Sequence, residues 1–132
     1  MGQPMAANLA REGFTVRSYD LKGHGNCGSI REAAKGAEVL VTMLPDGDAV
    51  TEAVLEALPI LPKGAIVVDM SSSDPAATRA LATALHAKGM KIVDAPVSGA
   101  RVKAKEGTLA IMIGGDAETV RRVRPVLEAM GS

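Results

Sequence analysis

The sequence predicts an α/β domain in which helices cover both faces of a mostly parallel, doubly wound sheet. Four times, an Ala-rich helical stretch ends at a glycine and a short run of β-branched residues follows at once. The four glycines are 23, 28 and 25 residues apart, about the length of one helix plus one strand. With 132 residues, 47% of them hydrophobic, the chain is expected to form one domain with a real core.

The first helix is expected over residues 3–11 and the first strand over residues 15–19, because Gly13 suits the left-handed position past a helix end. Gly36, Gly64 and Gly89 mark three further helix-to-strand transitions in the same way. They predict helices over residues 29–35, 48–58 and 75–88, and strands over residues 39–43, 65–69 and 90–94.

The helix over residues 75–88 has the clearest signals, because Asp74 can cap it and Pro75 suits its first turn. After Asp94 we expect a loop rich in Pro, Gly and Ser, followed by an apolar strand over residues 109–113. A last helix is expected to start at Asp116 and run to about Met130.

Composition excludes several classes of function. The 15 basic residues balance 15 acidic ones and only 2% of residues are aromatic, which leaves neither a basic stripe nor a stacking platform for nucleic acid. The single thiol, Cys27, forms no internal disulfide or cysteine-based metal cluster, and no metal site is expected. The absence of a secretory signal or a long apolar run predicts a cytoplasmic protein with no membrane partner.

Ligands of doubly wound sheets bind at the carboxyl ends of the strands. There, Asp20 either accepts hydrogen bonds from the two hydroxyls of an adenosine ribose or starts a polar turn. Met43, Leu44 and Pro45 offer an apolar surface for a flat ring. Ser71 either attracts an anion or caps the following helix, and the tight segment around Ser98 and Gly99 presents a hydroxyl and amides to a small polar ligand.

Several short motifs carry a resemblance to a known family. Residues 1–9, MGQPMAANL, resemble the second half of the dinucleotide fingerprint of the β-hydroxyacid dehydrogenases, the family of 3-hydroxyisobutyrate and 6-phosphogluconate dehydrogenases. The resemblance continues through TMLP at 42–45, VDMSS at 68–72 and DAPVSG at 94–99, and it ends with GTL at 107–109 and MIGG at 112–115. It covers nearly the whole chain.

The resemblance implies a Rossmann-like NAD(P)-binding domain and reversible hydride transfer between a small β-hydroxyacid and a nicotinamide cofactor. It implies that Ser98 and Gly99 hold the substrate. It assigns the cofactor to a set of six residues: Gly2, Asp20, Met43, Leu44, Pro45 and Ser71. A carboxylate at position 20 favours NAD over NADP, because it repels a 2′-phosphate.

Two parts of the family pattern have no match in residues 1–132. These are the first, central strand with its two glycines, expected before Met1, and the all-helical domain with the proton-transferring lysine, expected after Ser132. Lys103 and Lys105 do not match that lysine and are expected to be exposed. We therefore expect an incomplete domain that is inactive alone; the alternative is a non-catalytic dinucleotide-binding or regulatory module.

The missing central strand also predicts how the chain associates. In the common doubly wound order it would lie between the strands that end near Tyr19 and Asp69, so we expect those two strands to have open inner edges. Open edges pair readily with another chain, which predicts a homo-oligomer.

Overall fold

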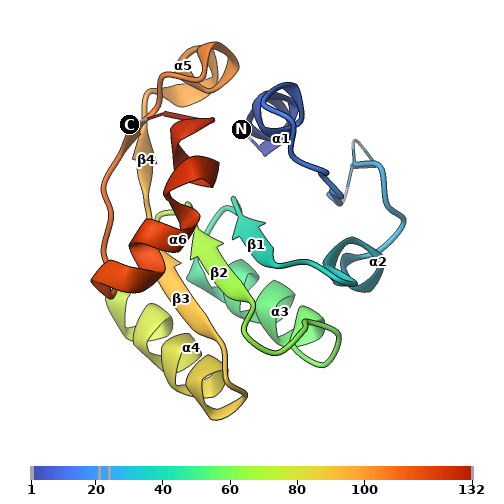
Figure 1. Ribbon diagram of the computed structural model, residues 1–132, viewed down its shortest axis with the longest axis vertical. Helices are drawn as coiled ribbons and strands as arrows, with labels where there is room; N and C mark the ends of the chain where they lie inside the picture. Colours follow the sequence, from blue (N-terminus) through green and yellow to red (C-terminus); the bar gives the residue numbers. More distant parts are fainter. Residues whose placement is uncertain (1, 21, 24, 132) are drawn as a thin grey trace.

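A parallel sheet of three strands forms the centre of the computed structural model, which describes residues 2–20, 22–23 and 25–131 (Figure 1). Its order is β1 (Val39–Thr42), β2 (Ile66–Asp69) and β3 (Lys91–Asp94). The register aligns Thr42 with Asp69 and Asp69 with Asp94, so the three strands end at one edge. Helix α3 (Gly47–Ala57) connects β1 to β2, and α4 (Pro75–Ala87) connects β2 to β3.

Helices cover both faces of this sheet and bury two separate apolar clusters. On one face, Ile66 and Val68 of β2 pack with residues from α1 (Gly2–Arg11) and α6 (Ala117–Glu128). On the other, Val67 packs with residues from α2 (Ile30–Ala34), α3 and α4. Successive residues of a strand point to opposite faces, so the continuous apolar run of β2 supplies both clusters. This two-faced covering confirms the doubly wound fold class.

The helices begin where short polar side chains cap them, as the sequence indicates. Ser29 accepts the N–H of Glu32, Asp46 that of Ala49 and Asp74 that of Ala76. Pro75 occupies the first turn of α4, where the backbone N–H has no partner within the helix, so proline loses no hydrogen bond there. The observed ends of these helices differ from the predicted ones by at most one residue.

The predicted loop after Asp94 is wrong in its middle, because α5 (Ala100–Glu106) forms there. This helix joins β4 (Val97–Ser98) to β5 (Ala110–Ile111), which pair antiparallel as a small second sheet. Gly107, with φ of 74°, ends the helix in the left-handed conformation. The buried Asn8 of α1 donates a 2.6 Å hydrogen bond to the Ala104 carbonyl and so fastens α5 to α1.

The predicted strand over residues 15–19 is also wrong, since the segment is extended but lacks a neighbouring strand in the part of the chain that the structure describes. The side chain of Asn26 makes hydrogen bonds to the segment that a neighbouring strand would otherwise make. Its Nδ2 donates to the Val16 carbonyl at 2.9 Å, and its Oδ1 accepts the N–H of Ser18 at 2.8 Å. Cys27 N–H adds a bond to the Ser18 carbonyl.

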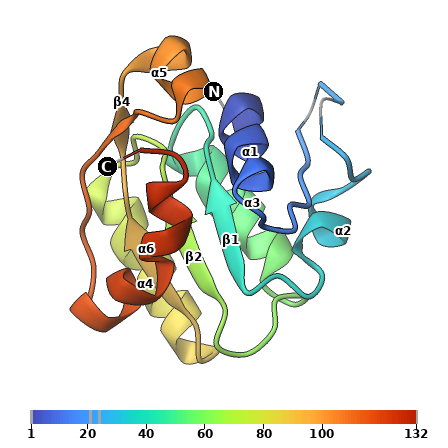
Figure 2. The same ribbon diagram turned by 45° about the horizontal axis from the view of Figure 1, so that its top comes forward.

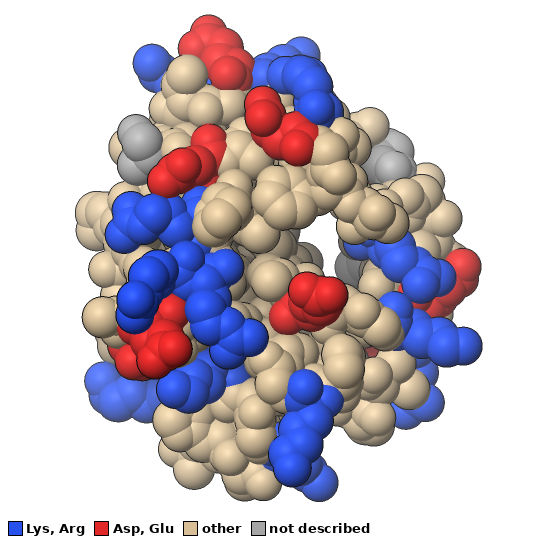
Figure 3. Space-filling model, in the orientation of Figure 1, with Lys and Arg blue, Asp and Glu red and all other residues tan. Residues whose placement is uncertain are grey.

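The position expected for the open edges needs a correction. The strand that ends at Asp69 is paired on both sides, whereas β1 is paired only with β2 within the described residues. The crossover through α3 places β1 and β2 side by side, so the open edge belongs to the strand that ends at Thr42. Figure 3 shows an opening through the molecule between β1 and the segment that follows α1.

Asp116 links the start of α6 to β3 and is expected to make stability depend on pH. Its carboxylate accepts from the hydroxyl and N–H of Thr119 and pairs with Lys91 Nζ at 3.2 Å. Chiefly the Thr119 hydroxyl, and then Lys91, lower the pKa of Asp116 from 3.8 to about 2. Because the pKa of Asp116 is lower in the folded chain than in the unfolded chain, its carboxylate stabilises the fold at pH values above 3.8. This contribution is lost as the pH falls towards the pKa of the folded chain, about 2.

Asp116→Asn is therefore expected to melt at a lower temperature than the unsubstituted chain at about pH 6, with the difference closing towards about pH 2. Thermal unfolding followed by circular dichroism measures this. Glu118→Gln, an exposed acid in the first turn of the same helix, is the control. A melting difference that stays constant with pH would contradict the prediction.

Candidate functional site

The candidate site is the edge of the sheet at which β1, β2 and β3 end, because the loops after these strands carry most of the predicted residues. Gly2, at the start of α1, lies beside the first of these loops. A Cβ built on Gly2 would be 3.9 Å from the Cβ of Met43. The amino end of α1 and the carboxyl end of β1 therefore meet, and two predicted cofactor residues are neighbours.

Leu44 and Ser71 join the first two loops directly. The N–H of Leu44 donates a 2.8 Å hydrogen bond to the hydroxyl oxygen of Ser71, whose side chain is fully buried. Asp74, three residues later, caps α4, so the helix-capping interpretation of Ser71 is wrong. Pro45 follows Leu44 and is exposed, which leaves its ring open to a ligand.

Below these loops, Asp69 and Asp94 end two adjacent strands. Asp69 is 1% exposed and accepts three hydrogen bonds, from the Thr42 hydroxyl, the Ser71 N–H and the Ser73 hydroxyl. Burial raises the pKa of Asp94, and the charge of Asp69 raises it further. The N–H of Ala95 donates to the Asp69 carbonyl at 2.8 Å, which ties the third loop to β2.

Asp20 lies at the end of the extended segment that faces β1 across the opening. Its Oδ1 accepts the N–H of Lys22 at 2.9 Å, and its carbonyl accepts the N–H of Gly23 at 3.2 Å. These bonds form a polar turn, which was one of the two interpretations of the sequence. They leave the ribose-binding interpretation as a prediction, because one carboxylate has several acceptor positions.

Ser98 and Gly99 lie one loop further along the edge. Ser98 is exposed at the end of β4, opposite Ala110, and Gly99 stands at the start of α5 with φ of 129°. A Cβ on Gly99 would come within 2.6 Å of Lys103, so only glycine fits without a shift. The stem of Lys103 thus passes close to the predicted substrate loop, while Lys105 is exposed.

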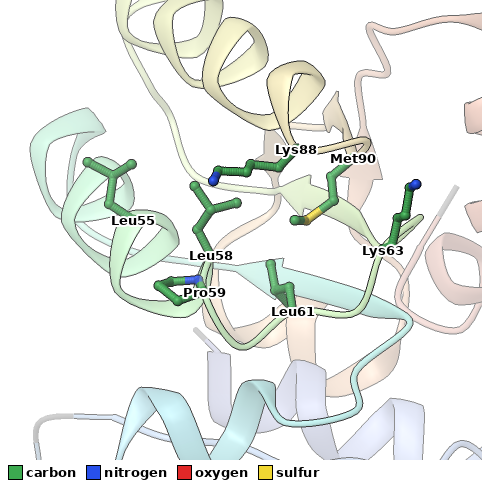
Figure 4. Close-up of a pocket in the computed structure, with 7 residues that line it drawn as sticks. All are labelled: Leu55, Leu58, Pro59, Leu61, Lys63, Lys88 and Met90. Carbon is green, nitrogen blue, oxygen red and sulfur yellow. The ribbon is translucent and has the colours of Figure 1, made fainter.

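The described part of the structure has two surface hollows of note. One is lined by apolar side chains with Lys63 and Lys88 among them, and Leu61 and Met90 place it at the amino ends of β2 and β3 (Figure 4). The other lies along α1 and α5, where Gln3 and Arg101 of its lining are close in sequence to the predicted residues Gly2 and Gly99. Within the described residues, no cluster of His, Cys, Asp and Glu is suited to a metal ion.

Sequence reasoning missed Thr42 and Asp69 as parts of the site. The available signal was an acid as the last residue of an apolar parallel strand, where burial demands hydrogen-bond partners.

A parallel sheet with helices on both faces and ligand-competent loops at its carboxyl edge defines a nucleotide-binding domain of the Rossmann type. The chain belongs to the NAD-binding domains of the β-hydroxyacid dehydrogenases. The family model described as the NAD binding domain of 6-phosphogluconate dehydrogenase matches residues 1–132. This match confirms the expected family, fold class and cofactor, NAD.

Individual relatives agree with this assignment. The chain is 40% identical to the 3-hydroxyisobutyrate dehydrogenase of Pseudomonas aeruginosa, with 99% of this chain and 48% of the relative covered. It is 38% identical to the 3-sulfolactaldehyde reductase of Escherichia coli, with 100% and 49% covered. The chain thus spans about half the length of the curated relatives that it matches.

A solved structure shows the same architecture. The Mycobacterium tuberculosis 3-hydroxyisobutyrate dehydrogenase with L-serine matches 99% of this chain and 48% of its own, with a TM-score of 0.93 and 38% identity. No described helix combines the length and the hydropathy that a membrane span requires.

Proposed function

We propose that this chain forms the NAD-binding part of an enzyme that transfers a hydride between a small β-hydroxyacid and NAD. The observation that carries the proposal is the convergence of predicted cofactor residues at one edge. Gly2 lies beside Met43, and Leu44 bonds to Ser71, although these residues come from separate elements. Relatives named as dehydrogenases and reductases support the reaction class.

Each predicted residue has a proposed role. Gly2 and residues 43–45 receive the middle of the cofactor, and Ser71 holds the loop beside them. Asp20 binds the adenosine ribose, while Ser98 and Gly99 bind the substrate carboxylate or hydroxyl. When bound, NAD accepts the hydride from the substrate carbon that carries the hydroxyl. The protein's part is to orient the two molecules and to exclude water.

A homo-oligomer and a cytoplasmic location complete the proposal. The open edge of β1 supports the oligomer, because an unpaired strand edge offers backbone hydrogen bonds to another chain. The single cysteine among 132 residues supports a reducing compartment.

Asp20→Ala tests the cofactor assignment. The variant is expected to lose affinity for NAD by roughly tenfold and affinity for NADP by much less, because only NAD has two free ribose hydroxyls for the carboxylate. Titration calorimetry of both cofactors on residues 1–132 extended in front of Met1 by a strand and Gly-x-Gly-x measures the ratio. Asp48→Ala, which removes an exposed acid from α3, is the control. An unchanged NAD to NADP ratio would remove Asp20 from the site.

A further inference from the structure

Asp69 is a carboxylate at the end of the central strand with no cation beside it in the described part of the chain. It is 1% exposed, and the one salt bridge found between described residues joins Lys91 to Asp116 instead. Burial of a carboxylate is unfavourable unless hydrogen-bond donors replace water. An apolar residue at this central position would have avoided that penalty.

Three neutral donors replace the lost water. The Thr42 hydroxyl and the Ser71 N–H each lie 3.0 Å from Oδ1, and the Ser73 hydroxyl lies 2.7 Å from Oδ2. The donors come from the end of β1 and from two positions in the loop after β2. The carboxylate therefore holds one strand end and one loop in fixed positions relative to each other.

Ser71 extends this arrangement to a second loop. Its N–H is bound by Asp69, and its hydroxyl oxygen accepts the N–H of Leu44. The position of Leu44 thus depends on Asp69 through a single intermediate residue. Ser71 is fully buried, so water does not compete for these bonds.

The order of the strands indicates which part of a cofactor this network serves. The sheet order is β1-β2-β3, and Figures 1 and 2 show the segment after α1 on the β1 side and β4 on the β3 side. If Asp20 binds the adenosine ribose and Ser98 the substrate, Leu44 and Ser71 lie between the two, where the middle of the cofactor leads into its nicotinamide half.

We infer that Asp69 is a positioning residue that shapes the loops at Leu44 and Ser71 for the nicotinamide half of NAD. The inference rests on the proposed function. It assigns no contact between Asp69 and the cofactor, because Asp69 is buried beneath the loops. Its charge matters because a carboxylate strengthens all three hydrogen bonds, whereas an amide is neutral and requires the Ser73 hydroxyl to turn from donor to acceptor.

The test compares NADH with AMP, which carries only the adenosine half. NMR titrations of residues 1–132 extended in front of Met1 by a strand and Gly-x-Gly-x give both dissociation constants for the unsubstituted chain, Asp69→Asn, Asp69→Ala and Asp74→Asn. Asp69→Asn is expected to lower the affinity for NADH roughly tenfold and to change the affinity for AMP less than about twofold. Asp69→Ala is expected to lower the affinity for NADH further. Asp74→Asn makes the same chemical change in the same loop but keeps a good helix cap, so it is expected to leave both ligands unchanged.

Amide hydrogen exchange provides a second readout that needs no cofactor. Leu44 and Ser71 are expected to exchange faster in both Asp69 variants, while the amides of β3 keep their protection. Equal weakening of NADH and AMP, unchanged NADH affinity in Asp69→Asn, or unchanged exchange at Leu44 would each overturn the inference. Absence of NADH binding by the unsubstituted chain would instead contradict the proposed function, and the positioning role with it.

Discussion

An extended segment joined in front of Met1, with five β-branched residues followed by Gly-x-Gly-x so that Gly2 becomes the third glycine of the fingerprint, is expected to raise the melting temperature by about 10 °C or more. The carbonyl of Glu38 accepts the N–H of Ile66, and the carbonyl of Thr42 accepts the N–H of Met70. Successive residues of a strand direct their backbone N–H and C=O groups to alternate sides, so those of Val39 and Val41 face away from β2. Four new backbone hydrogen bonds at about 1 kcal/mol each, together with burial of the added side chains, account for a gain of this size.

The opening beside β1 supplies the space for that strand. Its far side is the extended segment whose residues 16 and 18 already bond to Asn26 and Cys27. The backbones of Thr15, Arg17 and Tyr19 therefore face the other way, so an inserted strand has partners on both sides. The glycines would end beside Gly2, where a Gly-x-Gly turn lets backbone approach a pyrophosphate. NAD affinity is expected to rise by roughly a hundredfold.

Light scattering, differential scanning calorimetry and NAD titration on both polypeptides measure these effects. Residues 1–132 alone are expected to form a dimer or larger species, or to fold poorly, while the extended chain is more stable. The control is an extension of the same length in which two prolines interrupt the strand and alanines replace the glycines. A monodisperse monomer of residues 1–132 with the melting temperature of the extended chain would contradict the prediction.

The elements of the fold followed closely from local sequence signals, and the pairing of the strands did not. Glycines, caps and β-branched runs predicted β1, β2, β3 and their connecting helices almost to the residue. Residues 15–19 carry the same local signal, but a strand also needs a neighbouring strand, and here the described backbone partners of the segment are Asn26 and Cys27 in a loop. Helix α5 was missed because its flanking glycines and serine resemble loop composition.

Several residues of the candidate site could also be predicted from local sequence, but the hydrogen bonds between them could not. Positions 43–45 and 71 were predicted because polar or proline-containing loops follow parallel strands, a rule that needs only the topology. The bond from Leu44 to Ser71 and the three donors on Asp69 depend on the register of β1 against β2. Register is set by packing across the whole sheet, so it is absent from any local pattern.

Residues 1–132 by themselves are expected to produce no measurable NADH from 3-hydroxyisobutyrate or L-serine and NAD. The resemblance implies that a lysine transfers the proton in this family, and no lysine of this chain matches its motif. General acid–base groups contribute about 10²- to 10⁴-fold to a rate, and weak cofactor binding lowers it further. Assays that follow the absorbance of NADH at high protein concentration set the upper limit on the rate.

Lys103 makes this a demanding test, because its stem lies against Gly99, next to the predicted substrate residue Ser98. Of the two lysines weighed as catalysts, it is the one for which a contact with this loop is described, so it is the first candidate to supply a proton. Lys103 is exposed, and none of the hydrogen bonds found between described residues orients its ammonium towards Ser98. Position alone is therefore not expected to give turnover. NADH production that Ser98→Ala or Lys103→Ala abolishes, with Lys105→Ala unchanged, would show that this chain carries a complete active site.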